Sequence, residues 1–552
     1  MRLDIARRAP PFCVTLLLAF FLAPALFLFS VASQENRISG TVNVTIDVSK
    51  VHSYVAPRAM GMHVSVYDNS LTHPQLHEIL RAAGITTLRY PGGGYADIYH
   101  WSTHKLTKWR GTDPPEFGYL GPNTDVGHFL QLVERLHGTA IFTVNYGSNL
   151  NGTGGGEPAE AAVWVAYTNG DPGDTKVIGK DSAGNDWQTV GYWASLRAAA
   201  PLPADDGRNF LRISHPAPFQ ILYWEIGNEV FGNGYYEKDG EGYTEDLHAP
   251  YAKDPKESAK LRRKNRAALS PETYGKNVVA FSQAMKAVDP AIKIGAVLNT
   301  PPMDNSWGPD WNPGVLKECG HFIDFVVIHW YTGNLLPPDW KILDDASYLS
   351  APQRELPDMV SALLDLFRKY CGENASKMQL TVTELGARPF AKRNDPSIDA
   401  LFAADAYSSL MEDGAANIDW LELHKPSFLD EKEQKPGPVY FGLQMIHRLA
   451  HINATLVDAR SSNSLLAVHA VLRGDGSLGL MFINKDPKDA ANVKVKISGG
   501  LFSRNGMRFD FDPRNPPAGY VTAGGPAAGL GNSFSLSVPA YSITDVTLPK
   551  EP

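Results

Sequence analysis

The sequence predicts a TIM (β/α)8 barrel followed by a C-terminal β-sandwich. From residue 60 onward, short apolar runs that end in Gly, His, Asn or Glu alternate with longer amphipathic stretches, which is typical of a parallel sheet with crossover helices. From about residue 454 the amphipathic stretches stop, and strand-like runs continue between Gly, Asp and Pro turns. A chain of 552 residues is long enough for one barrel-sized domain and a second module.

The first 33 residues have the pattern of an export signal. Three arginines within the first eight residues precede an apolar stretch at 13–29, and small residues follow at 31–33. An apolar stretch of about 17 residues is at the lower limit for a membrane span, so a retained anchor is the alternative. The small residues favour cleavage. We therefore expect an exported protein, periplasmic or extracellular, with no stable membrane insertion once the signal is removed.

Composition and charge exclude several kinds of partner. The formal net charge is -8, and it becomes about -10 without the first 33 residues, because they hold three arginines against one aspartate. No basic stripe interrupts this acidic balance, so nucleic acid is not expected as a partner. No group of His, Cys and carboxylate residues has the spacing of a metal site, so we expect no metal and no other cofactor. The oligomeric state has no signal in the sequence.

Eight apolar runs are predicted to be the strands of the barrel. They cover residues 60–65, 86–91, 140–146, 221–229, 292–298, 322–330, 379–384 and 417–423. Eight strand-helix units of this kind are typical of a TIM barrel, which we place at residues 56–452.

The connections between these runs carry helix signals. Ser270 can cap a helix, Pro271 suits its first position, and Asp289 and Pro290 end it. A second helix is predicted over 352–370, where apolar residues recur at helical spacing. Residues 170–220 are too long for a bare connection, so they are predicted to be an excursion of the third crossover.

The C-terminal region, residues 453–552, is predicted to be the β-sandwich. Its clearest strand-like runs are 464–472, 478–484, 493–497 and 533–538. Residues 40–48 alternate apolar and polar side chains with a period of two, which indicates a half-buried strand. We expect the segment 34–55 to join the sandwich, so that both ends of the mature chain lie in one module.

Two glutamates at predicted strand ends indicate the chemistry. Glu229 ends the fourth predicted strand in Trp-Glu-Ile-Gly-Asn-Glu, and Glu384 ends the seventh in Thr-Val-Thr-Glu. The catalytic groups of such barrels lie at the carboxyl ends of the strands. Strands ~4.8 Å apart and tilted by ~36° place the two carboxyl groups roughly 5 to 6 Å apart across the barrel. This separation favours retaining over inverting hydrolysis of a glycosidic bond.

The surroundings of the two glutamates predict different roles. Aromatic residues on both sides of Glu229 would desolvate it and raise its pKa, as a general acid requires. Thr383 and Arg388 would keep Glu384 ionised as a nucleophile. The alternative for either glutamate alone is a salt-bridged residue of the rim, but two of them on these strands favour catalysis.

Other predicted strand ends supply candidates for binding the sugar. They are Arg89, Asn145, Asn228, His329, Tyr331 and Trp420, with weaker candidates in His63, Glu422 and His424. Arg89 would fix a sugar hydroxyl or pair with Glu384, or would only support the glycine turn after it. His329 and Tyr331 would cover the face of the sugar and hydrogen-bond to Glu384.

Cys319 and Cys371 precede neighbouring strands at the opposite end of the predicted barrel. A disulfide between them is geometrically reasonable in an exported protein, and free thiols are the alternative.

Six segments resemble the α-L-arabinofuranosidases of glycoside hydrolase family 51. They are residues 88–93, 157–169, 192–197, 224–229, 323–331 and 383–386. The resemblance covers about residues 55–450 and implies a TIM barrel paired with a β-sandwich. It implies that Glu229 is the acid/base and Glu384 the nucleophile. It also implies that the subsite for the cleaved sugar is lined by Arg89, Asn228, His329 and Tyr331.

Two positions depart from the family pattern. Gly94 lies where the family usually has Asn, and Ser65 or Val66 lies where it has a sugar-binding Glu after the first strand. Both departures remove contacts to arabinofuranose, so an endo-glucanase or another exo-glycosidase of the same clan is an alternative. A carbohydrate-binding envelope protein without turnover is an alternative of another class. The prediction is a retaining, exo-acting arabinofuranosidase that acts on side chains of plant-type polysaccharides.

Overall fold

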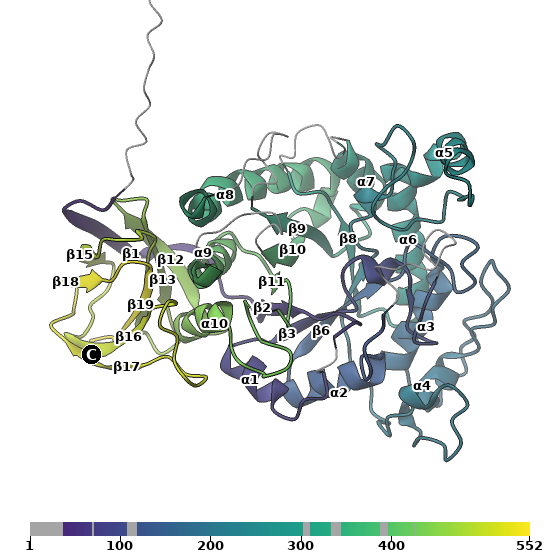
Figure 1. The fold of residues 1–552 in the computed structure, drawn as a ribbon, viewed down its shortest axis with the longest axis horizontal. Helices are drawn as coiled ribbons and strands as arrows, with labels where there is room; N and C mark the ends of the chain where they lie inside the picture. Colours follow the sequence, from purple (N-terminus) through teal and green to yellow (C-terminus); the bar gives the residue numbers. More distant parts are fainter. Residues whose placement is uncertain are drawn as a thin grey trace, which may run out of the picture. The chain divides into compact units, whose positions relative to one another are not determined.

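The computed structural model describes residues 37–68, 71–107, 119–301, 308, 310–332, 344–386, 396–425 and 427–551. The predicted export signal and Arg388 lie outside the described residues. Within the described ranges, no helix has the length and apolar character needed to cross a membrane. Residues 37–552 form one unit, which contains a closed barrel and a nine-stranded sheet (Figure 1).

The closed barrel of eight parallel strands confirms the predicted fold class. Its strands follow the hydrogen-bonded order β10-β11-β2-β3-β6-β7-β8-β9. They are β2 (Arg58–His63), β3 (Thr87–Tyr90), β6 (Thr139–Val144), β7 (Tyr223–Ile226), β8 (Lys293–Val297), β9 (Phe325–Tyr331), β10 (Gln379–Gly386) and β11 (Asn417–Trp420). Because all eight run in parallel, their carboxyl ends meet at one mouth.

Helices connect consecutive strands and cover the outside of the barrel (Figure 1). They are α1 (Leu76–Ala82), α2 (Val126–Leu136), α3 (Pro158–Asn169), α4 (Val190–Ala198), α5 (Pro255–Lys264), α6 (Pro271–Val288), α7 (Trp311–Cys319), α8 (Asp345–Tyr370), α9 (Asp399–Glu412) and α10 (Pro438–Leu449). Short 3-10 turns are η1 (Gly94–Asp97), η3 (Asn209–Leu211), η4 (Val230–Gly232), η5 (Arg266–Leu269), η6 (Gly372–Asn374) and η7 (Pro396–Ile398), and a small hairpin is formed by β4 (Tyr99–His100) and β5 (Lys105–Leu106). Helix α6 begins and ends as predicted, with Ser270 as its N-cap and Asp289 as its C-cap.

Helix α8 begins earlier than predicted. Its N-cap is Asp344, whose carboxylate accepts a hydrogen bond from the backbone N–H of Ser347 at 2.7 Å. Pro352, the predicted start, lies inside the helix together with Pro357. Proline is favoured in the first turn of a helix, so residue 352 resembled a start, although the capping residue lies eight positions earlier.

The long excursion in the third crossover is an ordered part of the barrel wall. Helix α4 packs against α3. Arg197 of α4 is fully buried and donates to the backbone carbonyls of Tyr167, Gly170 and His215 at 2.6, 3.0 and 3.0 Å. One guanidinium therefore holds both ends of the excursion.

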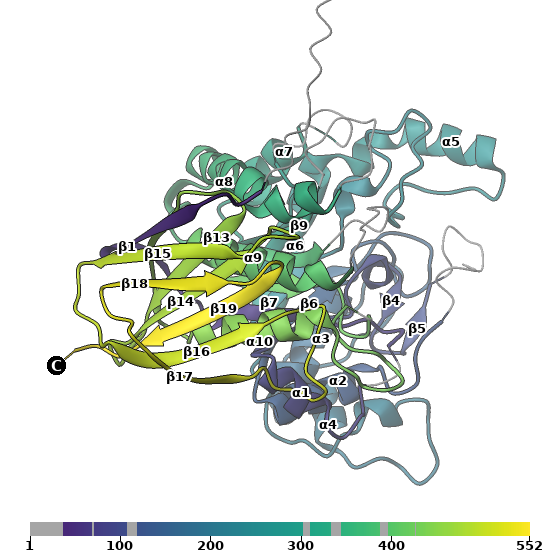
Figure 2. The ribbon, with the colours of Figure 1, turned by 60° about the vertical axis from the view of Figure 1, so that its left-hand side comes forward.

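The second module is a nine-stranded sheet with the order β17-β16-β19-β14-β13-β12-β1-β15-β18. Its strands are β1 (Thr41–Tyr54), β12 (Thr455–Ser461), β13 (Leu466–Leu472), β14 (Leu478–Asn484), β15 (Ala491–Ser498), β16 (Asn505–Phe511), β17 (Gly524–Ala528), β18 (Ser533–Val538) and β19 (Ser542–Leu548). The sheet curls, so that β18 packs against β14 and β19 (Figure 2). Apolar side chains of β1, β14, β15 and β19 fill the core that the two halves enclose.

Helices α9 and α10 contact both the barrel and the sheet (Figure 1). A buried charged group joins α9 to the sheet strands. Asp405 of α9 pairs with Lys485 at 2.5 Å and with His469 of β13 at 3.0 Å, and His469 also contacts Glu412 at 2.8 Å. The two modules are therefore tied by charges that are shielded from water.

Cys319 and Cys371 are free, buried thiols, so the disulfide considered from the sequence is absent. Cys319 is the last residue of α7, and Cys371 directly follows α8. Burial raises the pKa of Cys371 to about 11 and that of Cys319 further. In such surroundings a cysteine packs as a small apolar side chain and needs no covalent partner.

Candidate active site

The two predicted catalytic glutamates face each other at the mouth of the barrel. Glu229 lies three residues beyond the end of β7, and Glu384 lies within β10. One carboxylate oxygen of each and a ring nitrogen of His329 all lie within 4.8 Å of one another. Carboxyl groups of retaining glycosidases are typically ~5–5.5 Å apart, whereas those of inverting enzymes are ~6.5–9.5 Å apart. The separation between the oxygens of Glu229 and Glu384 therefore matches retaining enzymes better than inverting ones.

Glu229 is held in a tight turn after β7. Its backbone is left-handed, with φ 44° and ψ 37°, and Gly227 before it has φ 76°. A residue with a side chain costs roughly 1–2 kcal/mol in this region, and such strain is often found at functional sites. The carboxylate of Asp97 supports the turn by accepting the backbone N–H of Asn228 at 3.3 Å. The side chain of Glu229 remains 22% exposed, so a substrate can reach it.

Glu384 is buried but charged. Arg89 donates to its Oε1 at 2.8 Å, and the hydroxyl of Tyr331 donates to its Oε2. Burial alone would raise the pKa of Glu384, but electrostatic interactions with His329 and Arg89 and the Tyr331 hydrogen bond outweigh it and lower the pKa to about 2. Arg388, the cationic neighbour expected from the sequence, lies outside the described residues, and among the described residues Arg89 of β3 places a positive charge beside Glu384.

Arg89 lies at the centre of a network inside the barrel. It is fully buried and donates to Glu225 at 2.7 Å, to His63 at 3.0 Å and to Asn228 at 3.0 Å, besides its bond to Glu384. Burial would lower the pKa of Arg89, but the charges of Glu225 and Glu384 raise it. A permanently charged guanidinium therefore fixes Glu384 and Asn228, the residue before Glu229, at the same time.

His329 lies between the two glutamates. Its Nδ1 is 2.9 Å from Oε1 of Glu229 and 3.5 Å from Oε2 of Glu384. Its Nε2 faces the hydroxyl of Thr383 at 3.1 Å. Because both partners of Nδ1 are carboxylate oxygens, Nδ1 carries a proton. Tyr331 also remains a donor, because burial and the two carboxylates raise its pKa well above the usual value.

A third carboxylate, Glu422, lies beside the first strand. It follows β11 and accepts hydrogen bonds from Ser65 at 2.8 Å and from Tyr67 at 2.6 Å. Burial would raise the pKa of Glu422, but the hydrogen bonds from Tyr67 and Lys425 lower it. Glu422 therefore provides a carboxylate next to Ser65, the position where the sequence departs from the family pattern.

His63 connects Arg89 to this group as a neutral ring. Burial and then the charge of Arg89 lower its pKa to about 4. Its Nδ1 accepts from Arg89, so the proton is on Nε2, which faces Ser65 at 3.2 Å. Ser65 in turn donates to Glu422, and the four residues form one chain of hydrogen bonds.

Asn145 does not present its amide to the site, which corrects the prediction of a substrate contact. Its Nδ2 donates to the carbonyl of Tyr99 at 3.2 Å and to the hydroxyl of Ser148 at 3.3 Å. Its Oδ1 accepts from the backbone N–H of Ser148 at 2.9 Å. The amide is thus used by the turn after β6.

Trp420 is also on the wrong side of the barrel for a substrate contact. It is 2% exposed and packs edge-on against Phe402 of α9, with ring centroids 6.3 Å apart. Its neighbour Asp419 is buried close to Arg89, inside the barrel. Successive side chains of a strand point to opposite faces, so Trp420 faces the helices. The ring of His424 is hydrogen-bonded to Asp68 and not to Glu229 or Glu384.

Three residues that support the site were not predicted from the sequence: Glu225 and Asp97, which are buried, and Tyr67, which is partly buried. A signal for Glu225 was available, because it alternates with Trp224 and Ile226 in β7 and therefore points into the barrel. Asp97 and Tyr67 lie in a 3-10 turn and a loop, where no periodic pattern indicates the direction of a side chain.

Comparison with known proteins finds similar sequences and similar folds. The probable α-L-arabinofuranosidase C of Aspergillus terreus is 24% identical over 381 residues, which cover 64% of this chain and 60% of the fungal protein. The GH51 α-L-arabinofuranosidase of Thermotoga petrophila superposes with a TM-score of 0.64 at 17% identity, over 92% of this chain and all of that one. This chain is similar to the α-L-arabinofuranosidases of glycoside hydrolase family 51. No protein-family model matches it.

The similarity in fold extends to proteins that are not named as arabinofuranosidases. CelM2, a bifunctional glucanase-xylanase from a metagenome library, superposes with a TM-score of 0.58 at 13% identity, over 93% of this chain and all of that one. Structural similarity at such identities establishes the barrel and the sheet module and leaves the sugar open. The chain spans about 60% of the length of the Aspergillus terreus relative.

Proposed function

We propose that this protein is a retaining, exo-acting α-L-arabinofuranosidase that removes side chains from plant-type polysaccharides. The proposal depends above all on the pair of glutamate oxygens within 4.8 Å of each other at the mouth of the barrel. One glutamate is buried and ionised, and the other is partly exposed. A double displacement requires this combination of a charged nucleophile and an accessible acid.

In the proposed reaction Glu384 attacks the anomeric carbon while Glu229 gives its proton to the glycosidic oxygen. The bond from the anomeric carbon to this oxygen breaks, and the arabinosyl group is held as an ester on Glu384. Glu229, now ionised, takes a proton from water, and the water oxygen displaces Glu384 from the same carbon. Two inversions at one carbon give net retention.

The neighbouring residues have positioning and binding roles in this proposal. Arg89 and Tyr331 hold both oxygens of Glu384, so that the carboxylate keeps one orientation. Arg89 donates a hydrogen bond to the side-chain oxygen of Asn228. The side-chain N–H groups of Asn228 are therefore directed to other acceptors, and a sugar hydroxyl is a suitable acceptor. Glu422 would accept a hydrogen bond from another hydroxyl of the same sugar.

The test is hydrolysis of aryl glycosides by the wild type, Glu229→Ala and Glu384→Ala. We expect the wild type to cleave 4-nitrophenyl α-L-arabinofuranoside and Glu384→Ala to lose at least about 10³-fold in kcat. Azide should restore turnover of this activated substrate to Glu229→Ala, because the azide anion attacks the anomeric carbon of the ester on Glu384 directly, needs no base, and leaves as the glycosyl azide. A wild type that cleaves no arabinoside, xyloside, glucoside or polysaccharide would be a binding protein, and the proposal would fail.

A second candidate is an endo-glucanase or another exo-glycosidase of the same clan. It is favoured by Gly94 and Ser65, which depart from the family 51 pattern, and by the superposition with CelM2. The products on arabinoxylan and on a mixed-linkage glucan distinguish the two. Free arabinose from arabinoxylan supports the first candidate, and shortened glucan oligosaccharides support the second.

We also propose that the protein is exported, on the basis of the charged start, the apolar stretch and the small residues in the first 33 positions. N-terminal sequencing of protein recovered outside the cytoplasm should begin near Gln34. A retained first segment would show that these residues form an anchor.

A further inference from the structure

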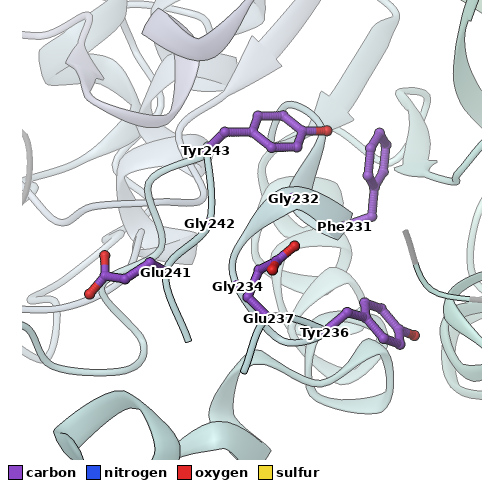
Figure 3. A pocket seen from close by; sticks show the side chains of 8 residues that line it. All are labelled: Phe231, Gly232, Gly234, Tyr236, Glu237, Glu241, Gly242 and Tyr243. Atoms are coloured by element: carbon purple, nitrogen blue, oxygen red, sulfur yellow. The ribbon is translucent and has the colours of Figure 1, made fainter. Parts of the chain in front are cut away.

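A cavity of about 270 Å³ lies beside the loop that follows Glu229. Its side-chain lining is Phe231, Tyr236, Glu237, Glu241 and Tyr243, with three glycines between them (Figure 3). Phe231 belongs to η4, the 3-10 turn whose N-cap is Glu229 itself. The first residue that lines the cavity therefore follows the proposed acid by two positions in the sequence.

The walls of this cavity are fixed by a buried arginine. Arg262 of α5 is fully buried and donates to the backbone carbonyls of Asn233 and Gly240, each at 2.6 Å. It also donates to the carbonyls of Asp246 and Ala249 at 3.1 and 3.0 Å. One side chain thus holds four points of an otherwise irregular loop, and the cavity is preformed.

Close backbone contact across the cavity requires glycine. The N–H of Tyr243 donates to the carbonyl of Gly232 at 2.9 Å. A Cβ added at Gly232 would lie 2.4 Å from the Tyr243 ring, and one added at Gly242 would lie 2.0 Å from the carbonyl oxygen of Gly232. The two segments that form the cavity therefore cannot separate or carry larger residues without losing its shape.

The lining combines aromatic rings with carboxylates. The rings of Phe231 and Tyr243 are steeply inclined, at 71°, with centroids 6.5 Å apart, and Glu237 extends toward the space between them (Figure 3). Among the described residues, the carboxylate of Glu237 has no hydrogen-bond or ion-pair partner, and the buried hydroxyl of Tyr236 has no hydrogen-bond partner. Aromatic faces pack on the C–H face of a sugar, while carboxylates accept its hydroxyls.

The mechanism determines what lies on this side of Glu229. A general acid gives its proton to the leaving oxygen, so the leaving group lies next to the acid. We propose that this cavity is the subsite for the leaving group and that it binds one neutral sugar ring of the polysaccharide. This inference rests on the proposed glycosidase function and names the part of the substrate that departs.

Size and charge narrow the class of sugar. The cavity is smaller than the ~300 Å³ at which pockets for drug-sized ligands begin, which leaves room for one pentose or hexose ring. The carboxylate of Glu237, which extends into this space (Figure 3), repels a uronic acid. The ring bound here is therefore neutral, such as a xylose of a xylan chain.

The test compares two leaving groups in the variant Glu237→Gln. One substrate is an arabinofuranosyl xylobiose, which places a sugar in the cavity, and the other is 4-nitrophenyl α-L-arabinofuranoside. We expect the ratio of kcat/KM for the first to kcat/KM for the second to fall roughly tenfold, because a carboxylate hydrogen bond to a sugar hydroxyl is lost. Tyr243→Ala should change the ratio in the same direction through the lost ring, with folding checked by thermal melting.

Glu257→Gln is the matched control. Glu257 lies on α5, is 61% exposed, pairs only loosely with Lys260 at 3.8 Å, and does not line the cavity. The substitution Glu257→Gln removes the same charge as Glu237→Gln, and it should leave the ratio of the two kcat/KM values within twofold of the wild type.

The possible outcomes separate the two proposals. Turnover by the wild type with a ratio that is unchanged in both Glu237→Gln and Tyr243→Ala would overturn the subsite alone. A wild type that cleaves neither substrate overturns the proposed function and the subsite with it. A uronic acid leaving group that reacts as well as the neutral one would overturn the assigned sugar class.

Discussion

At Glu384, burial and charge act on the pKa in opposite directions. Removal from water favours the protonated carboxyl, while His329, Arg89 and the hydroxyl of Tyr331 favour the carboxylate. These three interactions outweigh the effect of burial, and the pKa of Glu384 is lowered to about 2. The proposed nucleophile is therefore ionised at every pH well above about 2.

Replacement of Tyr331 by phenylalanine tests this balance. The variant loses the hydrogen bond to Oε2 of Glu384, so the pKa of Glu384 should rise. Activity requires the ionised form, and the acidic limb of the kcat/KM profile should therefore move to higher pH, with a loss of about tenfold at the optimum. The measurement is a pH profile with an aryl arabinofuranoside from pH 3 to 8. An acidic limb in the same place would show that Tyr331 does not act on Glu384.

The cluster of Glu229, His329 and Glu384 is also a donor set that a divalent cation can bind. The proposed reaction needs both carboxylates free, and Arg89 at 2.8 Å from Glu384 opposes a second positive charge. We expect EDTA to leave turnover unchanged and Zn²⁺ to inhibit in competition with substrate, because it would occupy both carboxylates. Loss of turnover on chelation, reversed by a metal, would contradict the proposed mechanism.

Among the elements, helix α6 shows how a single side chain defines a boundary. The hydroxyl of Ser270 accepts the N–H of Thr273 at 3.2 Å, and Pro271 occupies the first turn. Ser270→Ala should lower the free energy of unfolding by about 1 kcal/mol without changing kcat, because only the cap is lost. Ser270→Asp keeps an acceptor and serves as the control. Equal stability of the alanine variant and the wild type in chemical denaturation would contradict the capping role.

The elements also show what could be predicted from the sequence. Apolar runs located all eight barrel strands, because a buried parallel strand needs a continuous apolar stretch. The direction of a side chain near a strand end was harder to predict. Successive side chains point to opposite faces of the sheet, so an error of one residue in the register reverses the predicted direction. Trp420 was assigned to the mouth but faces α9, and Glu229 lies beyond its strand, in a turn.

Contacts between distant segments were not predictable from local patterns. Glu422 and Ser65 are hydrogen-bonded, although 357 positions separate them. Arg89 joins Glu225 and Asn228, which belong to one segment, to Glu384, so that three distant parts of the chain meet at its guanidinium. A motif indicates which residues are chemically suited to a site, whereas the closure of the barrel determines which of them meet.

For the whole molecule, the buried charges between α9 and the sheet link stability to pH. Burial would lower the pKa of His469, but Glu412 and Asp405 raise it to about 10, well above its unfolded value of ~6.5. For Asp405, burial would raise the pKa, but Lys485 and His469 lower it to about 2. The stability from His469 is thus complete below about pH 6.5 and is lost as pH rises toward 10, while that from Asp405 is lost as pH falls through about 2.

His469→Gln should reveal this dependence. At pH 6 the variant should be about 3 kcal/mol less stable, because Asp405 and Glu412 lose a buried charged partner. The difference from the wild type should shrink between pH 7 and 10, as the wild-type histidine loses its proton. Denaturant unfolding at a series of pH values measures it, and exposed His321, changed to Gln, is the control. A difference that is constant with pH would show that His469 is not charged at the interface.

The place of β1 within the sheet has a consequence for the order of folding. This strand is near the N-terminus, yet it lies between β12 and β15, with Val44 opposite Ser461 and Val495. At 5–20 residues per second, a ribosome needs roughly 20 to 90 s to pass from β1 to the end of β15. Both edges of β1 are without their partners until β12 has been made, and the edge that faces β15 is without its partner throughout that time. The last quarter of the chain therefore decides when its first strand is protected from pairing with other molecules.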